Sequence, residues 1–186
     1  MAIDALHDSF LPVRLETARL LLRPVSPDDA QVIFEGYASS PEALRFLTFP
    51  PTKSAAETAS FFLAARQDWA VGNRCVYAMV LRSSGETIGT IDTRRRSAFI
   101  AEVGYAMRPQ DWGKGLMAEA VKAIADRVLA HPEIYRFQAY CDVDNLASAR
   151  VMEKAGMQRE GLLRRYSIHP NMSSEPRDVL LYARVR

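Results

Sequence analysis

The clearest hydrophobic periodicity in the chain lies between residues 116 and 129. Apolar residues recur there at spacings of one and four, and charged residues occupy the opposite face. This pattern is typical of an amphipathic helix with one buried side. It predicts a long helix that ends near Pro132.

The other segments alternate between strand-like and helical patterns. Short turns join three apolar runs between residues 75 and 107, which indicates an antiparallel meander. Gly156 follows a helical segment as a C-cap, and segment 167–176, rich in proline and small polar residues, is predicted to be a mobile loop. Strands are predicted over 15–24, 75–82, 87–93, 98–107, 135–141, 157–164 and 177–185, and helices over 26–38, 56–69 and 146–155.

This element order predicts an α+β fold of mixed α/β type. A central strand–helix–strand crossover among short connections gives a mostly antiparallel, twisted sheet with one central parallel strand pair, covered by helices on both faces. The chain shows no repeat and no linker, so residues 1–186 are assigned to one domain.

Composition excludes several classes of protein. The 186 residues are 48% hydrophobic and 25% charged, and their net charge is +2. These values argue against a disordered chain. A net charge so close to zero also gives no indication of a polyanionic partner such as a nucleic acid. No apolar run reaches the ~20 residues of a membrane-spanning helix, so no membrane partner is expected.

The two cysteines lie in apolar runs. Cys75 and Cys141 are therefore interpreted as buried, reduced thiols of a cytoplasmic protein. With three scattered histidines in the chain, a Cys/His zinc site is not expected, and no metal site is predicted.

Two glycines directly precede the long helix. Gly113 and Gly115 flank Lys114, and no Ser, Thr or Asp caps the helix start. The first helical turn has free N–H groups, and glycines let a phosphate approach the backbone closely. The segment predicts an anion site for a phosphorylated cofactor. The competing interpretation is a solvent-capped helix after a flexible turn.

Segment 113–118 also satisfies the G-x-G-x-x-G/A dinucleotide fingerprint. That motif belongs after the first strand of a βαβ unit, with an acidic residue at the end of the following strand. Here four predicted strands precede it, and Glu133 lies before its strand. A phosphate-binding P-loop is excluded, since the chain has no Gly-Lys-Ser/Thr sequence.

The run QDWGKG at 110–115 resembles the Q/R-x-x-G-x-G/A signature of the GNAT superfamily of acyl-CoA N-acetyltransferases. Segment 145–157 is similar to the N-x-x-S … E-K-x-G-F/M segment of the ribosomal-protein N-terminal acetyltransferase branch. The resemblance covers about 15–184, which would be the domain core. Supporting similarity lies at 15–20, 102–105, 160–161 and 178–183.

This resemblance implies acetyl-CoA as co-substrate. In the family, backbone N–H groups of the loop hold the pyrophosphate, and the preceding strand pairs with the pantetheine arm where the sheet splays. Gly104 would permit a bulge that frees an N–H for the acetyl carbonyl. The implied cofactor-binding residues are Tyr105, Ala106, Met107, Gln110, Trp112, Gly113, Lys114, Gly115, Leu116, Met117, Ala118, Asn145 and Ser148.

The implied reaction is direct attack of a primary amine on the thioester in a ternary complex. Glu102 is the candidate base, and Ser148 is the candidate donor to the leaving sulfur. The competing interpretations are amine binding by Glu102, a helix-surface hydroxyl for Ser148 and a helix N-cap for Asn145. Tyr166 is an alternative site residue. The run 163–166 has no acid where the branch sometimes carries one, so the base stays open.

Several alternatives remain. The acceptor could be a protein N-terminus or a small amine, and the oligomeric state, a homodimer included, is open. A non-catalytic acyl-CoA-sensing module is the rival function, and an aminoacyl-tRNA acetyltransferase would need a broader basic surface than a net charge of +2 provides. The basic turn 94–96 is interpreted as a solvated face. Phe61, Phe62 and Trp69 are expected in the core or in the acceptor pocket. Nothing in the sequence accounts for a tryptophan at position 112.

Overall fold

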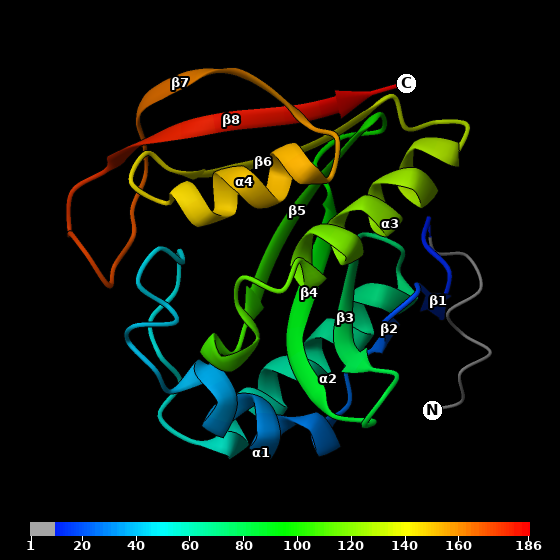
Figure 1. The fold of residues 1–186 in the computed structure, drawn as a ribbon, viewed down its shortest axis with the longest axis vertical. Coiled ribbons are helices and arrows are strands. Elements are labelled where there is room, and N and C mark those ends of the chain that lie inside the picture. The colour runs from blue at the N-terminus through cyan, green and yellow to red at the C-terminus, as the bar shows by residue number, and fades with distance from the viewer. Residues whose placement is uncertain (1–9) are drawn as a thin grey trace.

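The computed structural model describes residues 10–186, which form one eight-stranded sheet with the strand order β1-β2-β3-β4-β5-β6-β8-β7 (Figure 1). The strands are β1 Leu15–Glu16, β2 Leu20–Pro24, β3 Arg74–Leu81, β4 Thr87–Arg95, β5 Ile100–Met107, β6 Arg136–Asp142, β7 Gln158–Ser167 and β8 Arg177–Val185. The helices are α1 Ala30–Ile33, α2 Ala55–Ala70, α3 Leu116–Ala130 and α4 Leu146–Lys154, with short turns η2 Pro27–Asp29, η3 Phe34–Ala38 and η4 Pro109–Asp111.

The parallel strand pair is β5 and β6, which α3 connects. Within the described chain, they pair at three positions, and the last of these is Glu102 with Gln138. Both strands continue for several residues beyond that pair, so they diverge (Figure 1). All other neighbouring strands pair antiparallel. The predicted mixed sheet with one splayed parallel pair is confirmed.

Helices cover both faces of the sheet. On one face α3 packs on a large apolar cluster that includes Ala101, Val103 and Met107 of β5. On the other face α1 and α2 pack on a second cluster, against which Ala106 lies. Because side chains alternate along a strand, odd-numbered residues of β5 face α3 and even-numbered residues face α1 and α2.

Two predicted elements differ from the structure. The strand expected over 15–24 is two short antiparallel strands, because Thr17 stabilises a turn between them: its hydroxyl oxygen accepts from Leu20 N, and its backbone N–H donates to Leu20 O. The helix expected over 26–38 begins at Ser26 with a capping box but is divided into η2, α1 and the π-helical η3.

Of the aromatic residues expected in the core, Phe62 and Trp69 are buried. Phe61 is 41% exposed, so the core position expected for it was wrong. The next residue along a helix points about 100° away, and Phe61 therefore faces outward, where the Arg74 guanidinium lies 5.0 Å from its ring.

Cys75 and Cys141 are buried thiols, and Gly156 ends α4 with a positive φ of 83°. Within residues 10–186, no helix combines the length and apolar character needed to cross a membrane, and no cluster of acidic, His or Cys side chains could hold a metal ion.

A close backbone approach between β4 and β5 requires glycine at position 89. A Cβ atom there would lie 2.5 Å from the carbonyl oxygen of Ala106 and 3.0 Å from Cα of Met107. Gly89→Ala is expected to lower the free energy of unfolding by about 1–3 kcal/mol, because rigid backbone must shift to admit the methyl group. Urea denaturation measures the change.

The matched control is Gly161→Ala on the edge strand β7, where an added Cβ would meet nothing within 4 Å. A loss of stability of the same size in both variants would contradict the close approach of β4 and β5.

Candidate active site

The edge of β5 that faces β6 is open beyond Glu102. The Arg108 N–H donates to Ile88 O on the β4 side. On the other side, Phe99 O accepts from the N–H groups of Tyr135 and Arg136, at the start of β6. Since backbone direction alternates along a strand, the peptide groups of Val103, Tyr105 and Met107 point into the gap. Val103, Tyr105 and Met107 therefore form an edge with which an extended ligand can pair.

No bulge at Gly104 creates this edge. Throughout the described strands, β4 and β5 pair without a register shift from Gly89↔Met107 to Arg95↔Ala101. The bulge predicted from the sequence was therefore wrong. The edge is free because β6 turns away from β5.

The open edge leads to the glycine loop and the start of α3. Gly113 and Gly115 both have φ of +76°, a left-handed conformation that favours glycine. Gly115 is the N-cap of α3, and no described side chain caps the helix. The N–H groups of the first turn, from Leu116 onward, are therefore available to an anion.

Asp111 organises this loop from a buried position. Its carboxylate accepts from Arg108 at 2.5 Å and from Lys114 at 2.7 Å. Burial by itself raises the pKa of Asp111, but the hydrogen bonds from Lys114 and Arg108 outweigh burial and hold the pKa below its ordinary value. The Lys114 charge is thus paired within the loop.

The structure explains why residue 112 is a tryptophan, which the sequence alone does not. Its indole Nε1–H donates to Met107 O at 2.8 Å. Met107 is the last residue of β5, and this bond folds the loop back onto the strand end. The ring is 46% exposed, so it also lines the surface beside the loop.

Sequence reasoning missed a clamp between the N-terminal strands and the loop. Arg19 donates to Lys114 O at 2.9 Å and to the Glu119 carboxylate at 2.7 Å. Thr17 donates to the same carboxylate at 2.6 Å. From the sequence, Glu119 is one of the charged residues on the polar face of the helix. The one signal of a further role is its place in the first turn, where the helix dipole stabilises an acidic side chain.

Tyr105, Ser148, Asn145 and Cys141 meet on the α3 and α4 side of the gap. The hydroxyl oxygens of Tyr105 and Ser148 lie 2.8 Å apart. Asn145 accepts from Ser148 N at 3.1 Å, so it is the N-cap of α4. Burial raises the pKa of the Cys141 thiol to about 11, although a hydrogen bond with Ser148 lowers it. Ser148 is therefore part of a half-buried polar group rather than an isolated surface hydroxyl.

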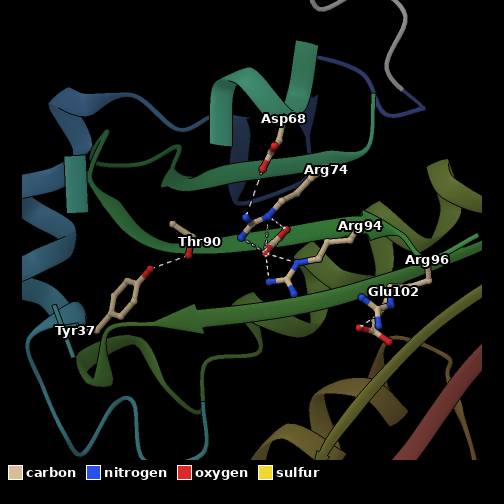
Figure 2. Close-up of polar contacts among 8 residues, drawn as sticks. Tyr37, Asp68, Arg74, Thr90, Arg94, Arg96 and Glu102 are labelled. Carbon is tan, nitrogen blue, oxygen red and sulfur yellow. Dashed lines mark hydrogen bonds and ion pairs between the residues drawn. The ribbon is translucent and has the colours of Figure 1, made fainter. Parts of the chain in front are cut away.

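Glu102 lies on the opposite side of the gap. Its carboxylate accepts from the Gln138 side chain at 3.0 Å. It also lies 3.7 Å from the Arg96 guanidinium (Figure 2). It is 9% exposed and belongs to the last β5–β6 pair. The carboxylate thus stands where the strands begin to diverge, on the face covered by α1 and α2.

The basic turn 94–96 is neutralised locally. Arg94 pairs with Asp92, and Arg95 pairs with Glu133. Arg96 faces Glu102 (Figure 2). These pairs support its interpretation as a structural, solvated segment.

Tyr166 approaches the same face from β7. Its ring meets that of Tyr140 on β6 edge to face, with 5.2 Å between centroids. Tyr166 is 50% exposed. The structure therefore places Ser148 and Glu102 on opposite faces of one gap, and Tyr166 beside Tyr140 on the Glu102 face.

Comparison with known proteins decides the family. Residues 19–158 match the model of the acetyltransferase (GNAT) domain. The chain belongs to the GNAT acetyltransferase family. Its class is that of acetyl-CoA-dependent N-acetyltransferases, with acetyl-CoA as co-substrate.

Relatives of this GNAT protein include the uncharacterized N-acetyltransferase YoaA of Bacillus subtilis, which is 29% identical over 178 residues, 92% of this chain and 96% of YoaA. A ribosomal-protein-serine acetyltransferase of Escherichia coli is 31% identical over 102 residues, 54% of this chain and 55% of the enzyme.

Solved structures share the fold. The ribosomal L7/L12 acetyltransferase RimL, in complex with CoA, has a TM-score of 0.80 and 22% identity over 94% of this chain and 96% of its own. The microcin C7 self-immunity acetyltransferase MccE, in complex with acetyl-CoA and AMP, has a TM-score of 0.83 and 18% identity over 96% of this chain and 99% of its own.

Arg19→Ala is expected to weaken acetyl-CoA binding about 10-fold, or about 1.4 kcal/mol, because it frees the glycine loop from the turn between β1 and β2. Isothermal titration with acetyl-CoA measures this. Arg14→Ala is the control, since Arg14 forms an exposed ion pair with Glu16. Equal affinity in the Arg19 and Arg14 variants would argue against the clamp.

The lowered pKa of Asp111 predicts a pH-dependent stability term. A carboxyl whose folded pKa lies below its unfolded value, here 3.8, stabilises the fold above that value. The stability difference between wild type and Asp111→Asn should be constant above about pH 5 and shrink as the pH falls through 3.8 toward the folded pKa. Urea denaturation at a series of pH values tests this. A difference that grows on acidification would have the wrong sign.

Proposed function

We propose that the protein transfers the acetyl group of acetyl-CoA to a primary amine that enters from the face covered by α1 and α2. The single observation that carries this proposal is the gap itself. It offers an unpaired β5 edge that leads to the uncapped start of α3, with Ser148 on one face and Glu102 on the other.

The cofactor-binding residues follow from that geometry. The N–H groups from Gly113 to Ala118 would hold the phosphates, with Gln110 and Trp112 at the entrance to the loop. The edge formed by Tyr105 and Met107 would pair with the pantetheine amides. Acetyl-CoA supplies an acetyl group already activated as a thioester.

The catalytic roles divide between the two faces. An amine that attacks a thioester must lose a proton, and the departing sulfur must accept negative charge. Glu102, at the start of the gap, is the proposed base, directly or through water. Ser148 is the proposed donor to the sulfur, and the adjacent Tyr105 hydroxyl orients it. Since a thiol has a pKa of ~8.5, the leaving group needs modest help.

Tyr166 is the proposed contact for the acceptor. It lies on the Glu102 face and is half-exposed at the end of the gap. The acceptor is a protein N-terminus or a small amine. Support exists for both, because RimL is a ribosomal-protein acetyltransferase and MccE is bound to AMP.

The direct test is acetyl-CoA binding followed by release of free CoA with a panel of amines. Wild type should bind acetyl-CoA with a measurable heat in isothermal titration and release CoA with at least one amine. No binding at millimolar acetyl-CoA would reject the function. Binding without CoA release from any amine would favour the rival acyl-CoA-sensing module.

Substitutions then assign the roles. Glu102→Gln is expected to lower kcat about 100-fold, and Ser148→Ala about 10- to 100-fold, with acetyl-CoA affinity within about threefold of wild type. Ser60→Ala, on the exposed side of α2, is the control for the hydroxyl. Unchanged kcat in both site variants would reject these two roles.

A further inference from the structure

The two halves of the sheet are joined by strand pairing at one end of the gap. Beyond the pair Glu102↔Gln138, nothing in the described sheet connects β5 to β6. On the face covered by α1 and α2, the unpaired end of the gap is called here the acceptor end. It is bordered by two chain segments, 39–54 and 168–176, which approach each other in Figure 1.

Segment 39–54 belongs to the half that contains β4 and β5. It follows η3, where the Tyr37 hydroxyl lies 2.7 Å from the Thr90 hydroxyl on β4. Leu44 is fully buried in the cluster beneath α1 and α2. Thr52 N donates to Ala38 O at 2.9 Å and closes the segment into a loop. The loop is therefore fixed to the β4–β5 half.

Segment 168–176 belongs to the half that contains β6 and β8. His169 is 2% exposed, and its Nε2 lies 3.8 Å from the Asp142 carboxylate at the end of β6. Arg177 of β8 donates to Asp142 at 2.6 and 3.0 Å. The backbone of Met172 and Ser173 turns around His169 O. This segment, predicted to be a mobile loop, is thus anchored to the β6–β8 half.

One side chain joins the two segments. The Asn171 Nδ2 group donates to Leu44 O at 2.6 Å and to Phe49 O at 2.9 Å. A primary amide has two N–H donors, so a single group spans both carbonyls. Because Leu44 is buried in one half and His169 in the other, the contact ties the halves across the end that strand pairing leaves open.

We propose that Asn171 is a positioning residue, a clasp that sets the width of the acceptor end of the gap and excludes water from it. The inference rests on the proposed function. Asn171 acts through the two segments, which hold Glu102 on β5 and the Tyr140–Tyr166 pair of the β6–β8 half at a fixed separation across the gap. A productive amine geometry requires such a fixed spacing, and a closed border limits attack by water on the thioester.

The test uses Asn171→Asp and Asn171→Ala in the full chain. The aspartate keeps the size of the side chain but places a carboxylate against two carbonyl oxygens. Asn73→Ala, at an exposed asparagine between α2 and β3, is the matched control. Circular dichroism checks that each variant is folded.

Amide hydrogen exchange and acetyl-CoA hydrolysis are then measured without any amine. Both Asn171 variants should exchange at least about 10-fold faster in segments 39–54 and 168–176, with α3 unchanged. They should also hydrolyse acetyl-CoA about 3- to 10-fold faster, as water enters, at unchanged acetyl-CoA affinity.

Unchanged exchange in segment 39–54, or unchanged hydrolysis, would overturn the clasp while wild-type acetyl-CoA binding stands. Failure of the wild type to bind acetyl-CoA would instead overturn the proposed function, and the role of the clasp with it. The two failures are therefore distinguishable.

Discussion

The divergence of β5 and β6 is the constraint on which the rest of the site depends. After Glu102 the two strands stop pairing, and backbone groups that a sheet normally satisfies face an open gap. Burying such groups without partners costs free energy, so the gap is stable where a ligand or water can reach it. The two apolar clusters on opposite faces hold the sheet together around it.

In the glycine loop, the basic side chains are paired with acidic ones. Arg108 and Lys114 face Asp111, and Arg108 also pairs with Glu86. These charges cancel locally, and their role is to hold the loop in its conformation. In the proposed function, the attraction for the phosphates comes from the N–H groups and the helix dipole. A chain with a net charge of +2 can therefore bind a highly charged cofactor.

Sequence periodicity was sufficient for most of the elements and for the position of the glycine loop. The long helix, the meander and the parallel pair follow from local patterns. Glycines at 113 and 115 are the residue type that a positive φ favours. The contacts that sequence reasoning missed join distant residues. Arg19 and Glu119 are 100 residues apart, and Asn171 and Leu44 are 127 apart. Such pairs leave no local periodic signal.

The wrong prediction at Gly104 has the same origin. A glycine in a strand is compatible with a bulge, but the register with β4 is decided by the whole strand. Similarly, the tryptophan at 112 is explained by Met107 O, and that partner became evident once the loop was seen to fold back on the strand. Residue types therefore indicated which chemistry the site could perform. The positions of the side chains depend on tertiary contacts that the sequence does not display.

The most direct test of the account is amide hydrogen exchange with and without acetyl-CoA. Acetyl-CoA should slow exchange at the open-edge amides of β5, Val103, Tyr105 and Met107, and in the loop and first turn of α3, from Gly113 to Ala118. Protection confined to other parts of the chain, with these amides unchanged, would contradict the claim that the gap between β5 and β6 is the cofactor site.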